Sequence, residues 1–176
     1  MEDGKVLLPI VSNKRECGDC TKCCEGAIPG QAYDYKFGQN VPCFFVESGL
    51  GCTIYEDRPV HACQTFKCQW LTDINIPEEY KPNKVDFITL KKGRSYFLLI
   101  PAGDNPSEEY VEFMKNYISE NNFNLSYRYN LNDEPMFIGS DRLKQTLAYS
   151  QKDHEPNAID RDIRLEQKRL AKLEEQ

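Results

Sequence analysis

Short runs of hydrophobic residues, each bounded by glycine, proline or charged residues, predict β-strands over much of the chain. VDFITL (85–90) and SYFLLI (95–100) are rich in β-branched and aromatic residues, and Gly93 lies in the KKGR segment between them. This pattern is typical of an antiparallel hairpin. Two further strands are predicted in FNLSYRY (123–129) and MFIG (136–139).

An earlier hairpin is predicted in PCFFVESGLGCTIY (42–55), where the β-rich arms CFFV and CTIY flank a glycine-containing turn. In such a hairpin Cys43 and Cys52 would lie nearly opposite each other. The proline of the next segment, EDRPVHACQTFKCQW (56–70), ends the strand. A short helix or turn is predicted to carry Cys63 and Cys68.

The clearest helix signal begins at residue 105. Asn105 is predicted as the N-cap, Pro106 as the first helical residue, and Glu108 as the third, as in a capping box. Apolar side chains then recur at helical spacing and predict one buried face. These are Tyr110, Phe113, Met114, Tyr117 and Ile118.

The mixture of helices and hairpins predicts an α+β fold. We expect a cysteine-bearing metal-binding segment (11–70), an α+β remainder of the same domain (71–150) and a charged C-terminal helix or tail (151–176). A polar, proline-punctuated connector (72–84) separates the first two, and a helix is predicted over 141–149. The C-terminal segment lacks a clean apolar face, so it is either a solvated, partly frayed helix or a helix that docks a protein partner.

Composition narrows the function classes. A chain of 176 residues suits one domain, and its net charge of −6 disfavours nucleic acids and anionic membranes as partners. The only apolar run near the N-terminus, VLLPIV, is broken by Pro9 and is too short for a signal peptide or a membrane span. We therefore expect a cytoplasmic protein, whose thiols stay reduced.

Eight cysteines dominate the candidate chemistry, and all lie between residues 17 and 68. In a reducing compartment such a cluster indicates a metal site rather than disulfides. The CxxCxxC run fits both an iron–sulphur loop and a zinc knuckle. The candidate ligands are Cys17, Cys20, Cys23, Cys24, Cys43, Cys52, Cys63 and Cys68.

The vicinal pair Cys23–Cys24 bears on the number of centres. In extended backbone adjacent side chains point to opposite sides, so the pair either serves two centres or includes a spare thiol. Cys63 and Cys68 would lie about 140° apart on a regular helix, which leaves the same choice. Eight thiolates divide evenly into two four-coordinate sites, and we favour two centres.

Basic residues near the cysteines have two interpretations each. Lys22, Arg58 and Lys67 could offset thiolate charge or be ordinary solvated cations. His61 could be a ligand or a proton donor, but eight sulfurs make it unnecessary. The sequence contains no P-loop, GxGxxG, GxSxG or HExxH motif, and no CxxxCxxC spacing.

The cysteine run resembles a known family. CGDCTKCC, a single Cys43 and CTIYEDRPVHACQTFKC together are similar to the YkgJ-type, or CxxCxxCC, cysteine-cluster family, described as a zinc- or iron-chelating domain. The resemblance covers residues 17–70, includes the IY-E-x-RP element and fills all eight cysteine positions. Some relatives with such a cluster are flagellin lysine methylases, which implies an iron–sulphur centre. This chain has no separate methyltransferase motif, so that activity is not carried over.

These observations predict a metal-chelating binding or accessory protein. The cofactor would be an iron–sulphur centre, which the CxxCxxC run and the family resemblance favour, or zinc. The alternatives are an iron–sulphur-dependent redox or protein-modifying enzyme, and a structural zinc module that supports an interaction surface. No catalytic residue is assigned.

Overall fold

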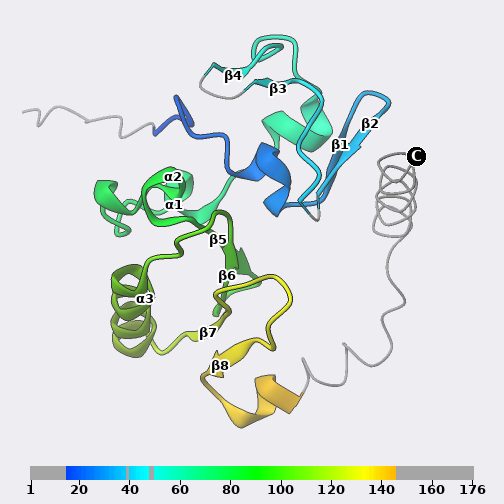
Figure 1. The fold of residues 1–176 in the computed structure, drawn as a ribbon. Coiled ribbons are helices and arrows are strands. Elements are labelled where there is room, and N and C mark those ends of the chain that lie inside the picture. Colours follow the sequence, from blue (N-terminus) through cyan, green and yellow to red (C-terminus); the bar gives the residue numbers. More distant parts are fainter. Residues whose placement is uncertain (1–14, 39, 48–49, 146–176) are drawn as a thin grey trace, which may run out of the picture.

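The computed structural model describes residues 15–38, 40–47 and 50–145. Its largest element of regular structure is a four-stranded mixed sheet in the order β5-β6-β7-β8 (Figure 1). Strands β5 and β6 are antiparallel, β6 and β7 parallel, and β7 and β8 antiparallel. The strands are β5 (Phe87–Lys92), β6 (Tyr96–Pro101), β7 (Asn124–Tyr127) and β8 (Met136–Ile138). Helices and strands of this kind confirm the predicted α+β class.

The hairpin of β5 and β6 forms where the sequence predicted it. Lys92 pairs with Tyr96, and Gly93 turns the chain with a φ of +64°, which glycine adopts without steric cost. Side chains of β6 alternate between buried and partly buried positions, as the two-residue period of a strand requires. The strand predictions for 123–129 and 136–139 are also confirmed, as β7 and β8.

Helix α3 (Glu108–Asn121) connects the parallel strands β6 and β7, as a crossover connection must. The predicted cap was wrong by two residues. Ser107, not Asn105, is the N-cap, and its hydroxyl accepts a hydrogen bond from the Tyr110 backbone N–H at 3.1 Å. Asn105 instead donates its backbone N–H to Asp86, 3.1 Å away. The predicted apolar face is buried or half-buried against the sheet.

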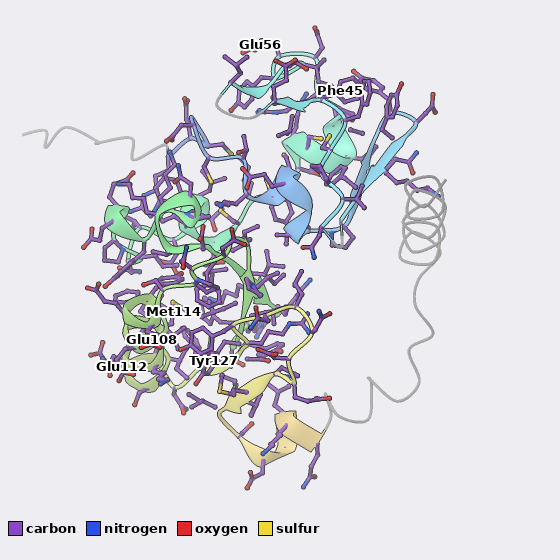
Figure 2. All side chains as sticks on the ribbon, in the orientation of Figure 1. Phe45, Glu56, Glu108, Glu112, Met114 and Tyr127 are labelled. Carbon is purple, nitrogen blue, oxygen red and sulfur yellow. The ribbon has the colours of Figure 1, made fainter. Side chains whose placement is uncertain are left out.

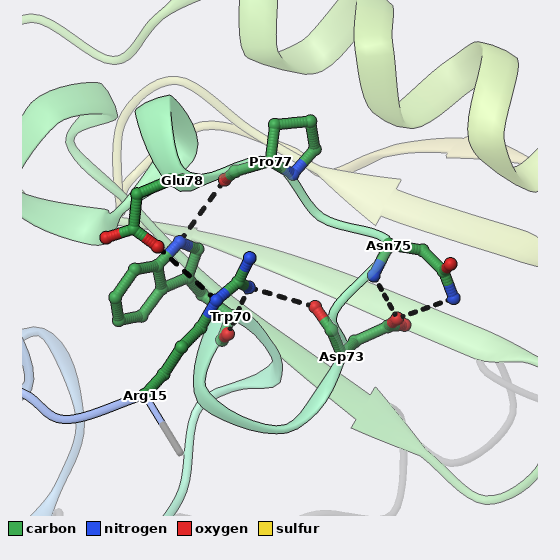
Figure 3. A network of polar contacts seen from close by, with 6 residues as sticks. All are labelled: Arg15, Trp70, Asp73, Asn75, Pro77 and Glu78. Carbon is green, nitrogen blue, oxygen red and sulfur yellow. Dashed lines mark hydrogen bonds and ion pairs between the residues drawn. The ribbon is translucent and has the colours of Figure 1, made fainter. Parts of the chain in front are cut away.

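The polar, proline-punctuated connector predicted over 72–84 contains the short helix η3 (Glu78–Tyr80) and most of α2 (Pro82–Val85), and helix α1 (Gln69–Thr72) ends at its first residue. Apolar side chains anchor this stretch, since Ile76 in the connector is fully buried and Trp70 in α1 nearly so. The Trp70 indole donates to the Pro77 carbonyl at 3.3 Å (Figure 3). Arg15 donates to the carbonyls of Trp70 and Asp73 at 2.8 and 3.0 Å, so the start of the cysteine segment is tied to α1.

The cysteine-bearing segment consists of short elements. They are η1 (Cys23–Ala27), β1 (Gly30–Ala32), β2 (Tyr35–Phe37), β3 (Val46–Glu47), β4 (Gly51–Cys52) and η2 (Val60–Gln64). The β1–β2 hairpin was not predicted. The β3–β4 hairpin was predicted too long, because Cys52 pairs with Val46 and Cys43 lies before the strand rather than opposite Cys52. The predicted helix or turn near Cys63 and Cys68 is confirmed, as η2 and the start of α1.

The buried hydrophobic side chains of the described residues form two groups. The main core lies between the sheet and α1 to α3, and Cys68 belongs to it. A second, small cluster has Ala32, Phe37 and Cys43 as its buried members within the described part of the chain. Figure 2 shows Met114 and Tyr127 in the first body of side chains and Phe45 in the second.

The C-terminal predictions fall partly outside the described residues. Residues 141–145 are helical, and the rest of the helix predicted over 141–149, like the segment 151–176, lies beyond them. Among the helices within residues 15–145 that the structure describes, none is long and apolar enough to cross a membrane.

Candidate metal centre

The fold brings all eight cysteines that were predicted as metal ligands to one cavity of about 870 Å³. Residues of the main core, such as Trp70 and Ile88, line it together with Phe37 of the small cluster. None of the eight cysteines, which all fall within the described residues, forms a disulfide. The cavity therefore has a wall of eight thiols, contributed by a segment that makes little regular structure of its own.

The first turn of the cysteine run is fastened to helix α2. The Cys20 backbone N–H donates to the Cys17 carbonyl at 2.9 Å and closes the turn. Asp19, at its tip, accepts hydrogen bonds from Lys81 Nζ at 2.5 Å and from Asn83 Nδ2 at 2.9 Å. The two thiols are thus held against a helix that lies more than sixty residues away in sequence.

Cys68 joins Cys17 and Cys20 in a first group of thiols. It occupies the N-cap of α1 and is buried in the main core. Burial raises the pKa of its thiol to about 11, and negative charge at Cys17 and Cys20 would raise it further. Cys23 packs against the same core. Its contact with Cys24 raises its pKa most, followed by its burial and then by negative charge at neighbouring cysteines, which include Cys17 and Cys20. We call Cys17, Cys20, Cys23 and Cys68 the inner set.

Three of the other four cysteines gather around the small cluster, and the fourth, Cys52, pairs in β4 with Val46, which packs against that cluster. Cys43 is buried there, Cys24 and Cys63 pack against it, and the Cys43 backbone N–H donates to the Cys24 carbonyl at 2.7 Å. Burial raises the pKa of the Cys63 thiol most, followed by negative charge at Cys24, Cys43 and Cys52. We call Cys24, Cys43, Cys52 and Cys63 the outer set. The two sets are neighbours, since charge at Cys24 also adds to the burial that raises the pKa of Cys17.

The vicinal cysteines join the two sets. Their sulfur atoms are 3.6 Å apart, and the Cys23 thiol donating to the Cys24 thiolate raises the pKa of Cys23 and lowers that of Cys24. The assumption of extended backbone was wrong, because both residues open the helical turn η1. Their side chains nevertheless diverge, Cys23 to the main core and Cys24 to the small cluster. Gly26 allows this turn, with a φ of +100° and no room for a Cβ beside Val41.

The arrangement fits a metal in its donor chemistry but is not a preformed ligand shell. Among the residues that the structure describes, no three Cys, His, Asp or Glu side chains are grouped closely enough to hold a metal ion. Burial raises the pKa of Cys17, Cys20 and Cys43, and the thiolate is the form of cysteine that binds a metal. Ligation would have to release protons and close the sulfurs on the metal together.

The basic residues near the cysteines behave differently from one another. Lys22 forms ion pairs with Asp86 at 2.9 Å and Glu25 at 3.4 Å, so carboxylates engage its charge. Lys67 and His61 line the cavity but are exposed. Arg58 lines the same cavity and is half-buried.

Some residues of the site were missed from sequence. The charge of Lys81 opposes the burial that raises the pKa of Cys17 and Cys20, and Arg15 lines the cavity. Neither stands in a motif, and only the fold brings Lys81 to the first turn, so the sequence offered no signal for it.

Comparison with protein-family models, with curated proteins and with solved structures gives no match. The resemblance of residues 17–70 to the YkgJ-type family therefore stays a prediction.

Proposed function

We propose that this protein chelates metal through two four-thiolate centres. The inner centre would use Cys17, Cys20, Cys23 and Cys68, and the outer centre would use Cys24, Cys43, Cys52 and Cys63. The observation that carries the proposal is that all eight thiols line one cavity, and that five of them lie in or against two separate groups of buried side chains. Cys23 and Cys68 lie at the main core, and Cys24, Cys43 and Cys63 lie at the small cluster. Four cysteine sulfurs are the donor set of both structural zinc and iron–sulphur sites.

The weak internal packing of the cysteine segment also supports metal binding. Over its described residues, its own cluster has three buried side chains and its strands are two or three residues long. A segment of this kind has little apolar burial to offset the entropy of ordering its backbone. Ligation free energy would supply that order, because the ligand set forms only in the folded chain.

An iron–sulphur cluster is the cofactor we favour, with zinc as the alternative. The CxxCxxC run and the family resemblance support iron–sulphur. Such a centre would supply one-electron transfer, whereas zinc held by four thiolates would supply folding free energy alone. We expect the metal-loaded protein to serve as a binding or accessory protein in a reducing compartment.

The test is metal analysis and an absorption spectrum of the full chain purified without oxygen. Iron–sulphur loading predicts a brown protein with broad absorption near about 400 nm and matching amounts of iron and sulphide. Zinc loading predicts a colourless protein with about two zinc ions per chain. Protein that contains neither metal, with its cysteines paired as disulfides, would refute the proposal.

A further inference from the structure

Arg58 lies on the cavity wall and is held both at its backbone and at its guanidinium. It lies between β4 and η2, and the following Pro59 restricts its backbone to extended conformations. Its carbonyl accepts a hydrogen bond from Gln64 Nε2 at 2.8 Å. Its guanidinium carbon lies 3.6 Å from the centre of the Tyr55 ring, a cation–π contact that holds the charged group in place. Arg58 therefore holds its charge on the cavity wall.

One donor of this guanidinium has no partner. Within the described part of the chain, Arg58 Nε and Asn83 Oδ1 are the buried side-chain polar atoms that make no hydrogen bond, and Arg58 Nε is the only donor of the two. A buried N–H without an acceptor costs free energy, and native proteins rarely leave one so. The cavity that Arg58 lines contains eight sulfur atoms, which become strong acceptors once they are thiolates.

Arg58 lines the same cavity as both sets of cysteines. The inner set and the outer set share that cavity wall with it. Lys67 also lines the cavity, but it is exposed and adjoins Cys68 of the inner set.

Two four-thiolate centres would need such a cation. Each centre keeps a net charge of about −2 whether it holds zinc or an oxidised four-iron cluster. Two such charges, on centres that would take adjacent residues of the chain, Cys23 and Cys24, as ligands, would repel each other in a partly buried site. We propose that Arg58 is a positioning residue for both centres, which offsets their combined charge and donates its Nε–H to a metal-bound sulfur.

This role rests on the proposed metal binding and predicts how the metal is retained. The experiment follows metal release to a chelator from the loaded full chain, with cysteine labelling and mass spectrometry to read each set separately. Labelling of Cys68 reports the inner centre, and labelling of Cys52 reports the outer centre. Arg58→Gln should speed release from both centres about tenfold or more, as loss of a hydrogen bond to a charged group implies.

Two further variants separate charge from packing. Arg58→Lys keeps the charge but loses the planar fork, so it should release metal from both centres faster than wild type and more slowly than Arg58→Gln. Lys67→Gln is the matched control for removing one cation at the cavity, and it should affect the inner centre alone, by less than about threefold.

Wild-type release rates from both centres of Arg58→Gln would overturn the inference and leave the proposed function intact. Release accelerated equally in the lysine and glutamine variants, and from the outer centre alone, would also overturn it, because Arg58 would then serve only to pack Tyr55 and its neighbours. If Arg58→Gln cannot be loaded, the lysine variant decides: retention of both centres supports the role, and failure to retain them refutes it. A metal-free wild type would refute the proposed function itself.

Discussion

Replacement of Cys24 by serine should remove one centre and unfold one part of the chain. Cys24 belongs to the outer set, and among the residues that the structure describes the small cluster beside it has three buried side chains, against fifteen in the main core. Full burial of Phe37 stabilises this cluster by about 3 kcal/mol, whereas a structural zinc site contributes about 10–16 kcal/mol. Loss of the outer centre therefore removes most of what orders strands β1 to β4.

The expected result for Cys24→Ser is half the metal content of wild type. Hydrogen exchange should accelerate in β1 to β4, while α3 and the β5–β6 hairpin keep their protection because the main core is intact. Cys23→Ser is the matched control, since it changes the neighbouring residue in the same way. It should also halve the metal content, but through the inner centre, with exchange accelerating first in the turn at Cys17 and at the start of α1.

Two outcomes would refute this reasoning. Full metal content in Cys24→Ser would show that Cys24 is a spare thiol and that the two-set division is wrong. Equal loss of protection in α3 and in β1 to β4 would show that the two groups of buried side chains unfold as one cooperative unit.

The remaining predictions concern the fold around the site. Tyr110→Phe should lower the free energy of unfolding by about 1–3 kcal/mol in chemical denaturation, because it removes a buried hydroxyl that lies 2.5 Å from the hydroxyl of Thr89. The double variant Tyr110→Phe, Thr89→Val should lose less free energy of unfolding than the sum of the two single variants. Burial and a hydrogen bond to a carboxylate raise the pKa of Tyr117 to about 12, so the folded state holds its proton longer and stability should fall as pH rises from about 10 to 12; Tyr117→Phe should reduce this fall in pH-dependent denaturation. Gly26→Ala should destabilise the protein by about 1–3 kcal/mol in thermal unfolding and weaken the outer centre, because a Cβ would lie 2.8 Å from the Val41 carbonyl oxygen at a positive φ; unchanged stability would contradict it.

Local sequence signals predicted those parts of the fold that depend on local physics. The β5–β6 hairpin follows from alternation and from Gly93, and α3 follows from its apolar face. The N-cap was misplaced because a proline such as Pro106 is typical of the first position of a helix. In the structure the Asn105 backbone N–H instead donates a hydrogen bond to the Asp86 carboxylate. The β1–β2 hairpin was missed because its two strands have only three residues each. The parallel pairing of β6 with β7 joins segments that no local pattern connects.

The candidate ligands could be selected from sequence, but their grouping could not. Spacing placed Cys17, Cys20 and Cys23 together, while Cys68 joins them only because α1 packs on the main core. The division at Cys23–Cys24 was predicted for a reason that proved wrong, since the backbone there is helical rather than extended. Arg58 was one of three candidate cations. Its unpartnered Nε distinguishes it from Lys22, which forms ion pairs with Asp86 and Glu25, and its partial burial distinguishes it from the exposed Lys67.

The adjacency of Cys23 and Cys24 limits how the gene can change. Between Cys24 and Cys43 the chain runs out along β1 and back along β2, so codons added at the tip of that hairpin would leave the sulfurs in place. Between Cys23 and Cys24 the link is a single peptide unit, with Cα atoms about 3.8 Å apart. One inserted codon there would rotate every later residue of η1 about the axis of the turn and move Cys24 off the small cluster. Homologous genes should therefore tolerate length changes in the hairpin loops and none between these two codons.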